Sequence, residues 1–166
     1  MRCFVVMGVT GCGKSTVGAA LAQACDMTFV DGDDLHPPAN IAKMASGVPL
    51  DDDDRRPWLG DVGQTLARTD GPAVIGCSAL KRAYRDIIRS NASEAVGFIH
   101  LDAKREVFAE RLQAREGHFM PAGLLDSQIA TLEPLGDDEA GQRIDIAQSV
   151  EDVVAQAAAY VREKMG

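Results

Sequence analysis

Five short apolar runs recur along the chain, and each is followed by a longer stretch with apolar residues at helical spacing. The runs occupy residues 2–7, 27–31, 72–77, 95–101 and 142–147. They are close to continuously apolar, which is typical of parallel strands covered on both faces. The stretches between them predict helices at about 14–25, 55–69, 81–90, 104–114, 123–132 and 149–164. This alternation predicts an α/β fold, a doubly wound parallel sheet with helices on both faces.

Composition narrows the class of protein. The 166 residues match the size of one domain, residues 1–166, and 46% of them are hydrophobic, enough for a core. Seventeen basic and 25 acidic residues give a net charge of −8, which argues against a nucleic-acid partner. The four cysteines lack the spacing of a zinc site. We recognise no signal peptide and no membrane span, and therefore expect a reduced, cytoplasmic protein with no membrane partner.

A glycine-rich segment, GVTGCGKST, lies between the first strand and the first helix and fits the pattern G-x-x-x-x-G-K-[ST]. In that context backbone N–H groups converge on phosphate oxygens, and the helix N-terminus adds positive potential. The lysine of this pattern reaches the β- and γ-phosphates, and the serine hydroxyl binds Mg²⁺. The segment predicts a nucleoside triphosphate site formed by Gly8, Val9, Thr10, Gly11, Cys12, Gly13, Lys14, Ser15 and Thr16.

Cys12 within this segment has two interpretations. The simpler one is a small residue that fits the loop. The other is a reactive thiol whose pKa is lowered by the surrounding N–H groups and Lys14.

Polar residues follow the second and third predicted strands. Asp31 and Asp33 end the second, where ligands of open α/β sheets bind. Lys81 and Arg85 follow the third and share one helix face, although such a pair taken alone more often marks a solvated surface. No Asn-Lys-x-Asp segment is present, which disfavours a GTPase, whereas a small-molecule kinase and a non-catalytic ATP-binding regulator both stay open.

Together these segments resemble the gluconate kinase family of P-loop kinases, relatives of shikimate kinase. The resemblance spans nearly the whole chain and rests on MGVTGCGKST, FVDGDDLHP, NIAKMASGVPLDDDDRRPWL, CSALKRAYRD, GHFM and LLDSQIATLE. It implies transfer of the γ-phosphoryl group of ATP to the 6-hydroxyl of D-gluconate with Mg²⁺. It also implies strand order 2-3-1-4-5, a homodimer, a substrate-binding insert at about 36–58 and a lid at about 115–123. A kinase of the same fold that acts on shikimate or another small acid stays open as an alternative.

The resemblance further implies roles for individual side chains. Arg55, in the D-R-x-P-W-L segment, is expected to grip the carboxylate of gluconate, and Asp33 to orient the attacking hydroxyl. Arg115 is expected to neutralise charge on the γ-phosphate, and Arg111 to lie on the adenine side. The catalytic set is then Lys14, Asp33 and Arg115, and the metal ligands are Ser15 and Asp31. The implied substrate contacts are Asp33, His36, Arg55, Lys81, Arg85, His118 and Gln128.

The segment LDDDDRRPWL also carries structural signals. Pro57 is tolerated in the first turn of a helix and predicts that the helix begins nearby, with Asp51–Asp54 around its N-terminus. Trp58 is interpreted as a packing anchor.

Overall fold

Five parallel strands form the centre of the molecule. They are β1 (Cys3–Met7), β2 (Thr28–Asp31), β3 (Ala73–Gly76), β4 (Val96–Asp102) and β5 (Gly141–Asp145). The computed structural model describes residues 1–114 and 122–166. Its strands lie in the order β2-β3-β1-β4-β5, and every neighbouring pair is parallel. The implied order 2-3-1-4-5 is confirmed.

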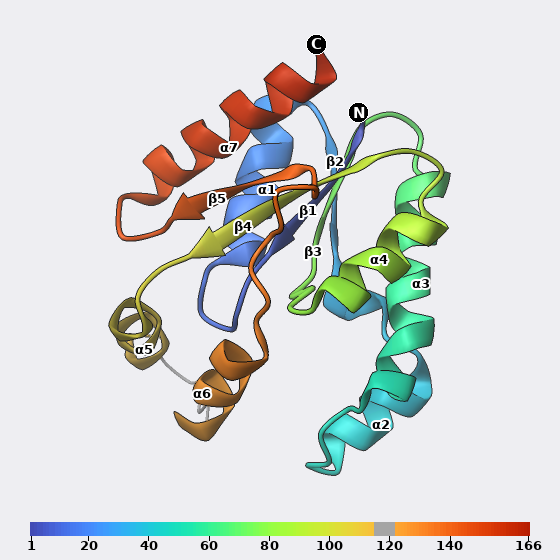
Figure 1. The fold of residues 1–166 in the computed structure, drawn as a ribbon, viewed down its shortest axis with the longest axis vertical. Helices are drawn as coiled ribbons and strands as arrows, with labels where there is room; N and C mark the ends of the chain where they lie inside the picture. The colour runs from blue at the N-terminus through green and yellow to red at the C-terminus, as the bar shows by residue number, and fades with distance from the viewer. Residues whose placement is uncertain (115–121) are drawn as a thin grey trace.

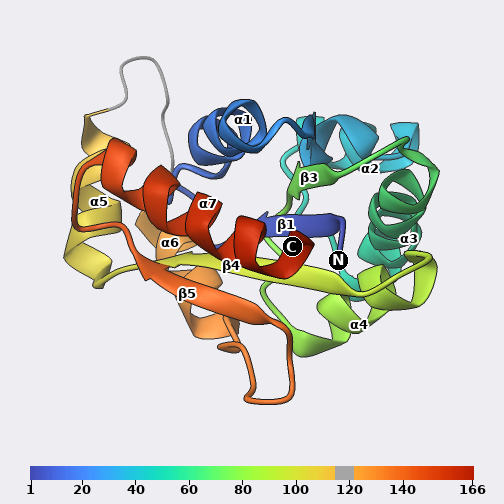
Figure 2. The same ribbon diagram turned by 90° about the horizontal axis from the view of Figure 1, so that it is seen from above.

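Helices cover both faces of this sheet (Figure 1, Figure 2). On one face lie α1 (Lys14–Cys25) and α7 (Val150–Met165), and on the other lie α3 (Asp52–Arg68) and α4 (Arg82–Asn91). Below the carboxyl ends of the strands in Figure 1 lie α2 (Pro38–Ala45), α5 (Arg105–Gln113) and α6 (Ala122–Thr131), opposite the two termini. A 3₁₀ turn, η1 (Gly32–Leu35), follows β2. Within the described ranges, no helix has the length and apolar character to cross a bilayer.

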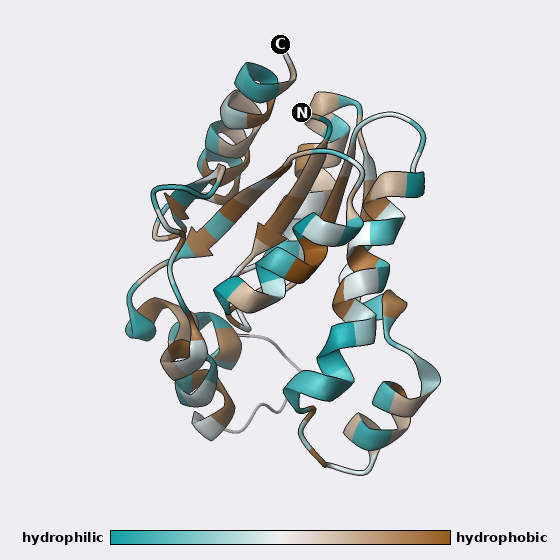
Figure 3. Ribbon diagram, turned by 45° about the vertical axis from the view of Figure 1, so that its right-hand side comes forward, coloured by the Kyte–Doolittle hydropathy of each residue, from teal (hydrophilic) through white to brown (hydrophobic). Residues whose placement is uncertain are grey.

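The core consists of two apolar layers separated by the sheet. Because side chains alternate along a strand, Phe4 and Val6 pack under α1 and α7, whereas Val5 and Met7 pack under α3 and α4. Figure 3 shows the apolar strands between helices whose outer faces are hydrophilic. The two edge strands differ from the expected coverage, since β2 and β5 keep mostly partly or fully exposed residues. Full burial on both faces holds for the inner strands β1 and β3.

The start of α3 is set by its acidic run. The Asp51 carboxylate accepts a hydrogen bond from the Asp54 N–H at 2.8 Å, and the Asp54 carboxylate accepts one from the Asp51 N–H at 2.9 Å. This reciprocal capping box satisfies two N–H groups that the helix leaves unpaired. The helix therefore starts three residues before the expected position of about 55, with Pro57 inside it, and the expectation that Asp51–Asp54 surround its N-terminus is confirmed. Helix α2 was not predicted, although Pro38 is its first residue, a position that proline favours.

Two glycines of α3 face α4 at different distances. A Cβ at Gly63 would lie 2.5 Å from the Ile88 carbonyl oxygen and 2.7 Å from the Asn91 Cβ. A Cβ at Gly60 would lie 3.7 Å or more from every neighbouring atom. Gly63 therefore permits the close approach of α3 and α4, whereas Gly60 has space for a methyl group.

We predict opposite effects for alanine at these two positions. Gly63→Ala should lower the free energy of unfolding by about 1–3 kcal/mol, because overpacking forces the helices apart. Gly60→Ala should raise it by up to about 1 kcal/mol, because alanine is the better helix former. Thermal unfolding followed by circular dichroism measures both, and equal shifts in Tm would contradict the packing described.

Candidate active site

The glycine-rich segment forms the connection from β1 to α1. Gly8 and Gly13 have φ angles of 147° and 89°, which favour glycine. A Cβ at Gly8 would also lie 2.6 Å from the Leu101 carbonyl oxygen. Helix α1 starts at Lys14, and no described side chain caps its N-terminus. Its first N–H groups thus form the type of anion site that binds phosphate.

Two side chains of this loop, Lys14 and Cys12, have different surroundings. The Lys14 ammonium donates to the carbonyl oxygens of Gly8 at 3.0 Å and Val9 at 3.2 Å, so it lies over its own loop. Cys12 is fully buried, and this burial raises the pKa of its thiol despite the nearby Lys14. Burial and the raised pKa favour the simpler interpretation, a small residue packed in the loop.

Ser15 and Asp31 form a pair of oxygen donors beside the loop. The Ser15 hydroxyl lies 3.2 Å from Asp31 Oδ2, and Asp31 Oδ1 accepts from the Asp33 N–H at 3.0 Å. Magnesium prefers oxygen ligands and is usually bound by one or two carboxylates together with substrate phosphates. In the described part of the chain, no group of three or more His, Cys, Asp or Glu could hold a metal. The pair fits a magnesium ion whose other ligands come from a nucleotide.

A pocket of about 460 Å³ lies next to the phosphate loop, within the usual range for small-ligand sites. Arg111 of α5 forms one side of it, and its guanidinium donates to the Ile146 carbonyl oxygen. The loop after β5 contributes Gln148 and Ser149, which the sequence did not indicate as site residues. The pocket is lined by Gly11, Gly13, Thr16, Val17, Arg111, Ala114, Gln148, Ser149 and Val150. It lies beyond the start of α1 and has room for the base and ribose of a nucleotide, and the adenine-side role of Arg111 stays a prediction.

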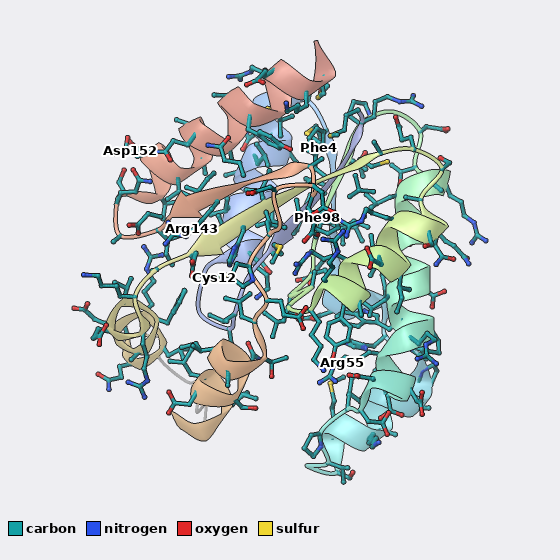
Figure 4. The ribbon with its side chains drawn as sticks, viewed as in Figure 1. Phe4, Cys12, Arg55, Phe98, Arg143 and Asp152 are labelled. Carbon is teal, nitrogen blue, oxygen red and sulfur yellow. The ribbon has the colours of Figure 1, made fainter. Side chains whose placement is uncertain are left out.

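A second polar group lies at the N-terminal ends of α3 and α4. Arg55 of α3 donates to the Tyr84 hydroxyl at 3.3 Å, and the charged groups of Arg55 and Lys81 lie 5.6 and 5.5 Å from the Tyr84 ring centroid. Figure 4 shows Arg55 on α3 and Cys12 in the phosphate loop. We call Arg55, Lys81 and Tyr84 the cationic cluster. The sequence indicated both cations but not Tyr84, although Tyr84 follows Lys81 by three residues, the spacing that brings side chains together on a helix.

The cationic cluster is joined to the phosphate loop through η1. Trp58 of α3 is buried and donates from its indole N–H to the Gly32 carbonyl oxygen at 2.8 Å. Its ring stacks on His36 with centroids 4.1 Å apart, which confirms the packing role. Burial lowers the pKa of His36. Asp33, on η1 between these groups and Asp31, is exposed.

Gln128 of α6 contacts the phosphate loop. Its side-chain oxygen accepts a hydrogen bond of 2.7 Å from the Thr10 N–H. Helix α6 is thereby attached to the nucleotide side of the site. Arg115, His118 and most of the expected lid at 115–123 lie outside the described residues.

Arg85 does not belong to the cationic cluster. It has no exposed surface and forms two hydrogen bonds to the Glu139 carboxylate, of 2.7 and 2.9 Å. Its remaining N–H groups donate to the carbonyl oxygens of Ala79, Leu80 and Pro134. The expectation that Arg85 contacts the substrate is therefore corrected, because its donors are occupied inside the protein. It fixes the loop that carries Lys81.

Comparisons with known proteins agree with this arrangement. The family model of shikimate kinase matches residues 10–163. A gluconokinase of Gluconobacter oxydans is 51% identical over 83% of this chain and 79% of its own. A thermosensitive gluconokinase of Escherichia coli is 45% identical over 92% of this chain and 83% of its own. The crystal structure of a gluconokinase from Sinorhizobium meliloti has a TM-score of 0.88 and 47% identity, with 97% of this chain and 91% of that chain covered.

The buried Arg85–Glu139 pair yields a stability prediction with a neighbouring control. Glu139→Gln leaves the Arg85 charge uncompensated, which should cost about 3 kcal/mol or more. For a chain of this size we expect a fall in Tm of roughly 6–12 °C or more. Asp138→Asn removes the next carboxylate, which pairs with Arg82 at the exposed surface, and should lower Tm far less. Equal losses in the two variants would contradict a special role for the buried pair.

The same pair predicts a pH dependence. The hydrogen bonds from Arg85 lower the pKa of Glu139 from 4.5 to about 2. Since the folded state binds this proton more weakly, the stabilisation is complete above pH 4.5 and is lost as the pH falls toward 2. The difference in Tm between wild type and Glu139→Gln should therefore narrow across that range. A difference that stays constant would show that the charge of Glu139 is not its source.

Proposed function

Since this chain belongs to the shikimate kinase family and its relatives are gluconokinases, we propose that it transfers the γ-phosphoryl group of ATP to the 6-hydroxyl of D-gluconate. The products are 6-phospho-D-gluconate and ADP. The choice of gluconate over another small acid rests on the gluconokinase relatives. The cationic cluster supports an acceptor that has a carboxylate, because its donors lie apart from the phosphate loop. A linear sugar acid needs such a site for its carboxylate and the nucleotide needs the loop.

The proposed roles fall to separate groups of residues. The phosphate loop and Lys14 bind the triphosphate and neutralise charge on it. Ser15 and Asp31 would hold Mg²⁺, which supplies further positive charge to the phosphates. Arg115 and His118 are proposed to act at the γ-phosphate and the acceptor.

The acceptor side depends on alignment. Arg55, Lys81 and Tyr84 hold the carboxylate by charge and hydrogen bonding. The chain of hydroxyls then extends toward η1, where His36 and Asp33 are available. Asp33 orients the 6-hydroxyl toward the γ-phosphate, and holding the two reactants in line is the main source of rate in phosphoryl transfer.

We further propose that the enzyme acts with Mg²⁺, in the cytoplasm and as a homodimer. The oxygen pair Ser15 and Asp31 supports the first, and four free cysteines are in keeping with a reducing compartment. The dimer rests on the family resemblance alone. Light scattering of the purified protein measures its mass in solution.

An assay of ADP release separates the possible functions. Purified protein with ATP and Mg²⁺ is given D-gluconate, shikimate or no acceptor. We expect turnover with D-gluconate only. Turnover with shikimate instead would favour the other kinase of this fold, and no turnover with either acid would favour a non-catalytic ATP-binding protein.

Arg55→Ala is predicted to raise the KM for gluconate roughly ten- to a hundredfold, because a charge-assisted hydrogen bond to the carboxylate is lost. The KM for ATP should stay the same. Arg56→Ala is the matched control, since Arg56 pairs with Asp53 at the surface and is 66% exposed. An unchanged gluconate KM in Arg55→Ala would remove Arg55 from the acceptor site.

A further inference from the structure

The cationic cluster already holds a carboxylate, that of Asp52. Tyr84 donates its hydroxyl hydrogen to Asp52 Oδ1, and Arg55 approaches the same oxygen at 3.4 Å. Lys81 approaches Asp52 Oδ2 at 3.5 Å. Two cations and a phenol from two different helices thus converge on one carboxylate. This is the donor set that the carboxylate of a sugar acid requires.

Asp52 is not needed to start its helix. The capping box of α3 is formed by Asp51 and Asp54, and Asp53 provides a further negative charge in the first turn. The N-terminus of α3 is therefore capped and surrounded by negative charge without Asp52. Its side chain is 56% exposed, so an incoming anion can reach the cluster from solvent.

The two cation contacts of Asp52 favour exchange over permanent attachment, and the short hydrogen bond from Tyr84 is the contact that an incoming carboxylate has to replace. The hydrogen bond from Tyr84, with the nearby Lys81 and Arg55, lowers its pKa, so it is ionised at neutral pH. Both cation contacts are long for charge-assisted hydrogen bonds, which are usually about 2.7–2.9 Å. Exposed ion pairs of this type contribute little free energy. A ligand that brings its own carboxylate and several hydroxyls has more contacts to offer.

We propose that Asp52 is an internal substitute for the carboxylate of the substrate, bound to the cationic cluster in the empty enzyme and displaced when the acid binds. This inference rests on the proposed function. Displacement brings a second negative charge beside Asp52. Part of the binding free energy of the substrate is therefore lost to breaking the contacts of Asp52 and to repulsion between the two carboxylates. Asp52 therefore raises the KM for gluconate, and it raises the concentration at which any weakly binding anion would occupy the cluster.

The opposite role makes the opposite prediction. If Asp52 instead oriented Arg55 and Lys81 for the substrate, its removal would weaken binding. The sign of the change in KM thus decides between displacement and positioning.

The test compares Asp52→Asn with Asp53→Asn. Both remove one negative charge from the first turn of α3, but Asp53 is 87% exposed and pairs with Arg56. Initial rates are measured against D-gluconate and against ATP for both variants and wild type. Asp52→Asn should lower the gluconate KM about two- to fivefold, the factor expected from an exposed ion pair, and should leave the ATP KM unchanged. Asp53→Asn should change neither.

Each other result overturns the proposal. A gluconate KM that is unchanged or higher in Asp52→Asn shows that Asp52 is not a competitor. An equal decrease in both variants shows a general charge effect. Equal Tm values for the two variants exclude a folding defect, and Tyr84→Phe, which retains Asp52, should raise the gluconate KM because the cluster loses a donor. If wild type does not phosphorylate gluconate at all, the proposed function itself is contradicted. If wild type is active and Asp52→Asn has the same gluconate KM, only the role of Asp52 is contradicted.

Discussion

The ion pair of Arg85 and Glu139 holds together the parts from which the site is built. Both side chains are removed from solvent, and a buried charge is tolerated only when it is paired and hydrogen-bonded. The guanidinium satisfies carbonyls of the loop before α4, at Ala79 and Leu80, and of the loop before β5, at Pro134. Ser78, in the first of these loops, accepts from the Gly8 N–H. The phosphate loop, the loop of Lys81 and the segment after α6 are therefore fixed relative to one another by one desolvated pair.

The opposite wall of the site depends on α3. Its acidic run would be a source of repulsion in most contexts, yet here the four aspartates have separate tasks. Asp51 and Asp54 cap the helix, Asp52 faces the cationic cluster, and Asp53 faces solvent. Trp58, one turn further along, attaches the helix to η1 through Gly32. Residues 50–59 thus begin α3, carry Arg55 and, through Trp58, connect the helix to η1, which carries Asp33.

Sequence patterns predicted the parts of this molecule that depend on interactions between residues close together in the chain. The strand–glycine–helix pattern located the phosphate loop, and the ends of β2 and β3 located Asp31 and Lys81. The acidic run located the N-terminus of α3, but Pro57 placed the expected start three residues too late, because the sequence pattern does not show which aspartates form the reciprocal cap. Arg85 was misassigned because its partner, Glu139, is 54 residues away in the chain, and spacing on a helix does not reveal such a contact. The contact of Asp52 with the cluster was missed for the same reason, since only the folded chain brings α3 and α4 together, whereas Tyr84 is three residues from Lys81 and its spacing was available in the sequence.

The polar side chains of the edge strand β5 affect how the protein associates with other copies of itself at high concentration. Strand β5 ends the sheet, and its Gln142, Arg143 and Asp145 are exposed, with Arg143 (Figure 4) bonded back to Asp102 of β4 at 2.7 Å. An unprotected sheet edge offers a row of backbone groups onto which a strand of another molecule can add. Charged side chains on this border make such an addition unfavourable, because they would have to lose their water. The polar residues of β5 therefore disfavour the edge-to-edge pairing of strands from which fibres grow.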